Sequence, residues 1–479
     1  MKAFLVILSI IFVTVAKGSS EKVTIECDSV TYFKSYFRSG AIHSSDFDVT
    51  CYIDNARENF DLIKTCAGFK SIYFNIICSN LTYLSTKNSI IKKIPSNFFM
   101  QVPKLTTFIA TNVNLEEIHR DDFKDAENLI VLNMADNMIE LLESEIFSYL
   151  KKLRILDLSN NKITSLDEET FIGSGDDLYE VYLSGNKINI LDYNVFKPIA
   201  TNKLYPLKLN MDSNKVQKIK ESNEPNSIQF HVLSLNKNQI SKFSCSGVKI
   251  SEIYLEENGL ETFDCDAQYI SIAKNNVKVL KLQNNAKGLG ISQNNIKVFS
   301  VDEKSEMMSL DMSDNGDISL QLEAVKNMTK LRRLSISSSF IGTVYDDLFA
   351  KMENLTYLYM NSCGLKSISS RLFLKNTELK FLEISNNQLE KLDLNVFIGS
   401  RQLSYIDISN NKLSRIGNIE KIKTILPELK QIKIYGNPWK CIEFSTIMRT
   451  LKQLNIKIAD NEPINKNYDV PNVSGIPCY

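Results

Sequence analysis

Two stretches of the chain share one pattern: LRILDLSNNKITSL at residues 153–166 and LKFLEISNNQLEKL at residues 379–392. Both read L-x-x-L-x-L-x-x-N-x-L-x-x-L, where L is an aliphatic residue. The position of the asparagine recurs 16 times, at steps of 17 to 28 residues, between Asn88 and Asn437. The chain is therefore an array of similar units. Clear examples of this ladder position are Asn137, Asn161, Asn186, Asn387 and Asn411.

The L-x-L core of each unit alternates with period two, so its aliphatic residues face one side and the intervening residues face the other. Stacked units then share one parallel sheet. The asparagine follows the strand, where its amide can pair with main-chain groups that would otherwise be buried without partners. A phenylalanine ten residues further on predicts an aromatic row in the core, formed by Phe98, Phe123, Phe147, Phe171, Phe196, Phe349, Phe373 and Phe397.

This pattern resembles that of leucine-rich repeat proteins, and the repeats cover roughly residues 80 to 440. The resemblance implies an α/β leucine-rich repeat solenoid, a curved horseshoe with a parallel concave sheet and disulfide-stabilised caps at both ends. We expect a signal peptide at 1–18, an N-terminal cysteine-rich cap at 19–80, about 15 to 16 repeats at 81–437, and a C-terminal cap at 438–479.

Repeats between about 215 and 315 are compressed, with ladder steps of 20, 17, 19 and 21 residues after Asn238. So little chain leaves no room for a helical return, which predicts extended return segments there. The register between 277 and 290 stays open, because Leu280 and Leu282 add an extra apolar pair.

The N-terminus predicts secretion. Lys2 precedes an apolar stretch from Phe4 to Ala16 that is too short to span a bilayer, and small residues follow it, as in a signal peptide cut near residue 18. No other run reaches 18 apolar residues, so we expect an extracellular protein without a membrane span. Sequons for N-glycosylation begin at Asn80, Asn327, Asn354 and Asn472.

Nine cysteines suit an oxidising compartment. Cys245 and Cys265 each follow a ladder asparagine by seven residues, which predicts a bridge between adjacent turns, with two buried thiols as the alternative. Cys363 occupies a ladder position and is expected to be a buried thiol. The N-terminal cap has three possible disulfide pairings among Cys27, Cys51, Cys66 and Cys78.

The segment Asn437-Pro-Trp-Lys-Cys441 resembles the start of the C-terminal cap of extracellular leucine-rich repeat proteins. The resemblance implies that Trp439 seals the last turn and that Cys441 pairs with Cys478. An amphipathic helix should follow, because apolar residues recur at helical spacing at Phe444, Ile447, Met448, Leu451 and Leu454.

The whole combination is similar to mosquito leucine-rich immune proteins. That similarity implies extracellular innate defence, through binding of a pathogen glycan, a complement-like thioester protein or another leucine-rich repeat protein. The coiled coil of longer members has no counterpart here. The alternative is an adhesion, matrix or receptor-associated protein in development, and an inhibitor of a secreted enzyme is a third candidate.

Charge and composition argue against other classes. The 56 basic and 56 acidic residues give no basic excess for nucleic acid, and the three histidines are scattered without nucleophilic or metal-binding neighbours. We expect no enzyme activity, no cofactor and no metal.

Residues six and four positions before each ladder residue should form the exposed concave face. Toward the C-terminus they give an aromatic strip that suits protein binding, with the alternative that these are ordinary solvated residues. Its members are Arg333, Tyr357, Tyr359, Phe381, Glu383, Tyr405 and Asp407. A second, acidic candidate group includes Glu180, Tyr182, Glu252 and Tyr254.

Overall fold

The computed structural model describes residues 11–15, 23–30, 48–54, 81–87, 89–201, 204–224, 226–283, 285–302, 305–341, 344, 346–459, 472–473 and 476–479. The chain divides into two compact units. The first consists of Met1–Ile240 and Cys245–Tyr254, and the second consists of Ser241–Ser244 and Leu255–Tyr479.

The first unit is built on a sheet whose early strands are antiparallel and whose strands from β3 onward are parallel and follow chain order. In each short strand the central residue is buried and its neighbours are half-buried, as the L-x-L pattern predicts. The strands of this main sheet are β1 (Ile11–Val15), β2 (Val23–Val30), β3 (Asp48–Asp54), β4 (Leu81–Lys87), β5 (Thr107–Ile109), β6 (Val131–Asn133), β7 (Ile155–Asp157), β8 (Glu180–Tyr182), β10 (Leu207–Asn210), β12 (Ile228–Ser234) and β14 (Val248–Tyr254).

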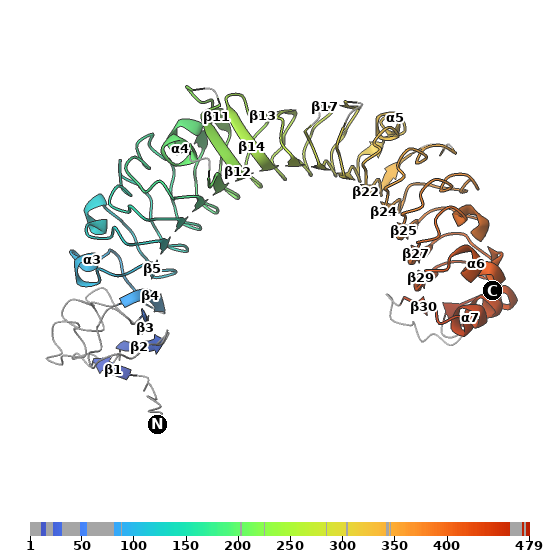
Figure 1. The fold of residues 1–479 in the computed structure, drawn as a ribbon, viewed down its shortest axis with the longest axis horizontal. Coiled ribbons are helices and arrows are strands. Elements are labelled where there is room, and N and C mark those ends of the chain that lie inside the picture. The colour runs from blue at the N-terminus through green and yellow to red at the C-terminus, as the bar shows by residue number, and fades with distance from the viewer. Residues whose placement is uncertain are drawn as a thin grey trace, which may run out of the picture. The chain divides into compact units, whose positions relative to one another are not determined.

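The main sheet of the second unit has parallel strands only, and its strands β22 to β29 follow one another in chain order (Figure 1). Its main sheet comprises β16 (Tyr269–Ser271), β18 (Gly288–Gly290), β20 (Ser309–Asp311), β22 (Arg333–Ser335), β24 (Tyr357–Tyr359), β25 (Phe381–Glu383), β27 (Tyr405–Asp407), β29 (Gln431–Lys433) and β30 (Lys457–Ile458).

Return segments on the other side of the repeats are turns, short helices or paired strands. The helices are α3 (Phe98–Gln101), η1 (Arg120–Phe123), α4 (Tyr193–Ala200), α5 (Leu322–Val325), η2 (Leu394–Phe397), η3 (Ile419–Lys421) and α6 (Ile422–Ile425). The strand pairs are β9 (Ile190–Asp192) with β11 (Lys218–Lys220), β13 (Lys242–Ser244) with β15 (Thr262–Asp264), β17 (Val279–Leu282) with β19 (Val298–Val301), β21 (Gly316–Asp317) with β23 (Ser339–Phe340), and β26 (Leu392–Asp393) with β28 (Ile416–Gly417).

The compressed repeats have extended returns, as their length predicts. Strand β17 also settles the open register, because Leu280 lies buried in the return strand while Gly288–Gly290 forms the main-sheet strand. In these repeats the buried phenylalanine also lies at a different distance from the ladder position than in the longer repeats. Phe243, Phe263 and Phe299 lie five residues after their ladder positions, and the rings of Phe243 and Phe263 stack 5.9 Å apart.

Where the returns are longer, the predicted phenylalanine row is buried, with neighbouring ring centroids 5.5 to 6.2 Å apart in the first unit. One member differs from the prediction. The ring that contacts Phe123 is that of Phe99, at 6.1 Å, whereas Phe98 packs on Phe99 and Phe108.

The asparagine ladder is present in both units. Asn161 accepts a hydrogen bond from the backbone N–H of Ile139 (3.0 Å) and donates to the carbonyls of Met134 and Leu158 (both 3.0 Å). Each such amide therefore joins its own turn to the preceding one. Equivalent bonds are made by Asn137, Asn186, Asn214, Asn238, Asn275, Asn294, Asn315, Asn387, Asn411 and Asn437. Asn88 lies outside the described residues.

A second row precedes the ladder. The residue before every described ladder position has a positive φ, between 53° and 69°, from Asn112 to Gly436. Only glycine, and to a lesser degree Asn and Asp, adopts this left-handed conformation without much strain. The dipeptides Asn-Asn, Asp-Asn and Gly-Asn are therefore the sequence signature of this turn, in which the first residue matters as well as the ladder asparagine.

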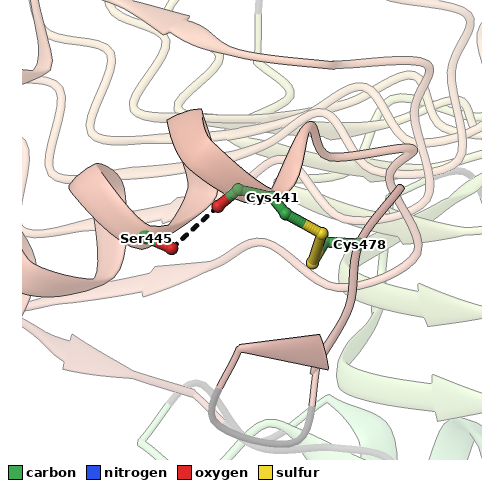
Figure 2. The surroundings of a disulfide bond; sticks show 3 residues. All are labelled: Cys441, Ser445 and Cys478. Carbon is green, nitrogen blue, oxygen red and sulfur yellow. Dashed lines mark hydrogen bonds between the residues drawn. A yellow bond between two sulfur atoms is a disulfide. The ribbon is translucent and has the colours of Figure 1, made fainter. Parts of the chain in front are cut away.

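The C-terminal cap has the features that the resemblance implied. Trp439 is fully buried, donates its indole N–H to the Ile434 carbonyl (2.9 Å) and stacks on Phe444. Helix α7 (Cys441–Gln453) buries Phe444, Ile447 and Leu451. Cys441 at its start is bonded to Cys478, with the Cα atoms 5.0 Å apart, beside the short pair β31 (Asn472–Val473) and β32 (Ile476–Pro477) (Figure 2).

The other cysteines are described in part. Cys245 and Cys265 are both disulfide-bonded, which excludes the free-thiol alternative, and their bridge to each other remains our prediction. Cys363 is a buried free thiol whose Sγ donates to the Ile336 carbonyl. In the N-terminal cap, the backbone register places Cys27 opposite Cys51. Cys66 and Cys78 lie outside the described residues.

Candidate protein-binding surface

The predicted aromatic strip lies on four consecutive strands of the second unit. The register aligns Arg333 on β22 with Tyr357 on β24, and then with Phe381 on β25 and Tyr405 on β27. Because the buried leucine between each pair of positions fixes the alternation, all of these side chains stand on the exposed face of the main sheet.

The rings of the strip contact one another. Phe381 and Tyr405 are nearly parallel, with centroids 4.3 Å apart, and the ring of Tyr359 lies 5.4 Å from that of Phe381. Tyr357 is 42% exposed, and the other three rings are half-buried. Packing of this kind lets each ring hold its neighbour in place, so the strip is ordered before any partner arrives.

Arg333 closes one end of the strip. Its guanidinium carbon lies 4.5 Å from the centroid of the Tyr359 ring, and its Nη1 donates to the Tyr359 hydroxyl (3.1 Å). These contacts fix the arginine over an aromatic face.

The two carboxylates of the strip are engaged inside the protein, and the expectation that Asp407 is exposed is wrong. Asp407 is only 5% exposed, because its Oδ1 accepts from the backbone N–H of Ser409 (2.9 Å) and its Oδ2 lies 3.7 Å from Lys433 Nζ. Glu383 accepts from Asn361 Nδ2 (2.8 Å).

Tyr405 remains a neutral phenol across the physiological range. Burial is the main cause that raises its pKa, and the nearby carboxylates of Asp407 and Glu383 raise it further. Its hydroxyl can therefore act as a hydrogen-bond donor to a partner.

The acidic candidate residues of the first unit pair with their neighbours. Glu180 accepts from Tyr182 Oη (3.0 Å) and from Lys208 Nζ (2.9 Å). Glu252 accepts from Tyr254 Oη (2.9 Å). The pKa of Tyr182 is raised to about 12 by burial and by the bond to Glu180. Because these side chains are hydrogen-bonded to one another, they offer a ligand fewer available groups than the aromatic strip does.

Three of the four sequon asparagines, Asn327, Asn354 and Asn472, are exposed, and Asn80 lies outside the described residues.

The sequence prediction of the binding surface did not include Asn361, whose Oδ1 accepts from both the backbone N–H and the hydroxyl of Ser385 (both 3.0 Å). Its position, two before the ladder residue Cys363, was a usable signal, because polar residues also fill that position in the neighbouring repeats.

Two family models match parts of this chain. The leucine rich repeat family model matches residues 103–163 and 151–201, and the model of the BspA type leucine rich repeat region matches residues 295–419. Both models describe leucine-rich repeats, and the fold of the chain is the leucine-rich repeat solenoid that the repeat pattern predicts. No curated protein sequence matches it.

Solved structures place it near mosquito proteins in fold. The leucine-rich repeat domain of APL1 is 18% identical and covers 89% of this chain and 97% of its own, with a TM-score of 0.51. The chain matched in the LRIM1/APL1C complex is 17% identical and covers 89% of this chain and 69% of its own, with a TM-score of 0.51. A leucine-rich repeat protein of the bacterium Leptospira interrogans is 16% identical and covers 82% of this chain and 99% of its own, with a TM-score of 0.51.

The predicted resemblance to mosquito leucine-rich repeat proteins is thus confirmed for the fold. Because a bacterial protein has the same TM-score, the fold alone does not select a biological role. Among the residues that the structure describes, no helix is both long enough and apolar enough to cross a bilayer.

Proposed function

We propose that this protein is a secreted, non-enzymatic binding protein of innate immunity that holds a protein partner on its aromatic strip. The observation that carries the proposal is the continuous contact of Tyr359, Phe381 and Tyr405 on the exposed face of a rigid sheet. Interface hot spots are enriched in tyrosine and arginine, and preformed rings lose little conformational entropy on binding.

The ring geometry favours a protein over a glycan. Sugars stack on open aromatic faces, but here the faces of Phe381 and Tyr405 cover each other at 4.3 Å. The ring edges and the phenol hydroxyls are available to a partner. Edges pack against apolar side chains, and hydroxyls bond to main-chain carbonyls, which are the groups that a protein surface offers.

A binding role without catalysis agrees with the state of the carboxylates. Glu383 accepts a hydrogen bond from Asn361, and Asp407 accepts one from Ser409 and lies beside Lys433, so both carboxylates are already paired within the protein. The strip therefore supplies apolar area and orientation.

The immune role rests on the fold shared with the LRIM1/APL1C complex and on the predicted signal peptide. Expression that rises on infection supports it, and constitutive deposition at tissue boundaries would instead support the adhesive role. A complement-like thioester protein or another leucine-rich repeat protein is the expected partner.

The direct test compares affinity capture from extracellular fluid by the wild type and by the triple variant Tyr359→Ala, Phe381→Ala, Tyr405→Ala. The matched control is Leu320→Ala with Phe340→Ala, which removes apolar side chains that are 80% and 55% exposed elsewhere in the second unit. We expect the strip variant to lose its partner and the control to retain it. Equal capture by all three proteins would eliminate the strip as the binding site.

A further inference from the structure

A row of cations borders the aromatic strip in the second unit. The residue just before each of the strands β22, β24, β25, β27 and β29 is joined to its equivalent on the next repeat by a backbone hydrogen bond of 2.8 to 3.0 Å. These bonds run continuously through Arg332, Thr356, Lys380, Ser404 and Lys430. Three of these five residues are cationic, and we name Arg332, Lys380 and Lys430 the cation row.

The charges of the cation row face solvent. All three side chains are exposed, and none of them has a hydrogen bond or ion pair with any residue that the structure describes. In contrast, Lys433 lies beside Asp407, and the Glu383 carboxylate is bound to Asn361. The surface that appeared from the sequence to be edged by carboxylates is therefore edged by unpaired cations.

Two acidic residues lie close to the row in sequence. Glu378 precedes Lys380 by two positions, and its Oε1 accepts from Gln402 Nε2 (3.0 Å). Glu428 precedes Lys430 by two positions and is exposed. The row keeps an excess of positive charge on a chain whose total charge is zero.

The spacing of the row is regular. Neighbouring strands lie about 4.8 Å apart, so Arg332, Lys380 and Lys430, which stand on alternate repeats, are about 10 Å apart along the sheet. An α-helix rises 1.5 Å per residue, so its residues i and i+7 are about 10.5 Å apart and its residues i and i+3 or i+4 are about 5 Å apart. A helix lying across the strands would match both the cations and the rings.

We propose that this surface binds an acidic amphipathic helix of the protein partner. The apolar stripe of the helix would lie on Tyr357, Phe381 and Tyr405, and acidic residues spaced seven apart would face the cation row. This inference rests on the proposed function and specifies the partner's chemistry. A sulfated polysaccharide would use the cations, but it has no apolar stripe to place on the rings, so the strip and the row together favour a protein helix.

The test uses two fluorescein-labelled helical peptides of 22 residues that carry the same leucine stripe. One has glutamate at seven-residue intervals beside that stripe, and the other has lysine at the same positions. Fluorescence anisotropy measures binding of each to the full-length protein, with heparin as a third probe. The variant is Arg332→Gln, Lys380→Gln, Lys430→Gln, and the control is Lys391→Gln, Lys412→Gln, Lys421→Gln, which changes exposed lysines outside the row.

We expect the wild type to bind the glutamate peptide at least tenfold more tightly than the lysine peptide. The row variant should lose at least tenfold in affinity with an unchanged circular dichroism spectrum, while the control keeps it. Equal affinity for both peptides, no binding of either, binding of heparin alone, or full affinity of the row variant would overturn the inference.

The capture experiment keeps the two proposals distinguishable. If the aromatic variant loses its partner while the row variant retains both partner and peptide, the protein-binding strip stands and the acidic helix is wrong. If the aromatic variant retains the partner, the proposed function itself is wrong.

Discussion

At the scale of single residues, the fold depends on two adjacent positions in every repeat: a left-handed residue and the ladder residue that follows it. Gly436 shows why the first position is selective, because its φ of 67° is a conformation that residues with a Cβ rarely adopt. Lys237, Glu257 and Lys274 adopt the same left-handed turn without being glycine or asparagine. Those repeats therefore carry local strain of about 1 kcal/mol each.

Replacing Lys237 with glycine should stabilise the protein. Lys237 is exposed and has a φ of 55°, so glycine relieves the strain without removing a packed side chain. After the entropy lost by glycine on folding, we expect a net gain of up to about 0.5 kcal/mol in the free energy of unfolding, measured by urea denaturation. Lys237→Val should instead destabilise, because β-branched residues tolerate this conformation least. The reverse order of the two variants would contradict the strain argument.

Replacing Asn161 with leucine should be among the most damaging single changes. Leucine cannot accept from the Ile139 N–H or donate to the carbonyls of Met134 and Leu158. Each buried group left unpaired costs about 1–3 kcal/mol, so we expect a loss of about 3 kcal/mol or more in denaturant titration. Thr164→Leu in the same repeat is the control, because this residue is exposed. A loss similar to that of the control would show that the ladder bonds do not stabilise the array.

Tyr182 should make the free energy of unfolding decrease at high pH. Its pKa is about 12 in the folded protein, above the usual value of 10.0, so the unfolded chain releases the phenol proton first as pH rises. The stabilising contribution is complete below pH 10 and is lost between about pH 10 and pH 12. In Tyr182→Phe, the midpoint of urea unfolding should fall less over this window than in the wild type. Parallel curves for the two proteins would be inconsistent with a raised pKa.

At the scale of elements, the length of the return segment decides where the core aromatic lies. Repeats with longer returns bury a phenylalanine ten residues after the ladder, and repeats with β13, β15 or β19 bury it after five. An extended strand reaches the core side sooner than a helical turn. The sequence therefore predicted extended returns from the step lengths but missed the aromatic at the fifth position.

Phe263 should be essential to the compressed repeats. It is 7% exposed and stacks on Phe243, so Phe263→Ala should cost about 3–4 kcal/mol in the free energy of unfolding. Thr262→Ala on the same strand changes an exposed side chain and should cost less than about 0.5 kcal/mol. Comparable losses in the two variants, measured by thermal and urea denaturation, would argue against a core role for the aromatic ring.

At the scale of the whole molecule, the repeat period was sufficient to predict the solenoid and the ladder, whereas the C-terminal cap was predicted from the resemblance carried by residues 437–441. The solenoid and the ladder depend on contacts between equivalent positions of neighbouring repeats, which a periodic sequence reveals directly. The candidate site was predicted only in part. The positions of Tyr359, Phe381 and Tyr405 followed from the period, but the burial of Asp407 depends on Lys433 in the next repeat and on a local turn at Ser409. Such side-chain pairings have no periodic signature.

An array in which each repeat contacts mainly its neighbours should lose order locally when a cap is weakened. Cys478→Ser removes the bond that closes a 37-residue separation to Cys441, which costs about 3–4 kcal/mol in the chain-entropy account. Without the disulfide bond, the C-terminal segment should detach, although its Tyr479 N–H donates to the Trp439 carbonyl (2.8 Å). Helix α7 should then protect the last repeat less well. Hydrogen exchange measured by mass spectrometry should accelerate in residues 441–458, less so around β29, and not in residues 130–190. Uniform acceleration along the chain would instead mean that the solenoid unfolds as one cooperative body, and the repeats would then be coupled far beyond their nearest neighbours.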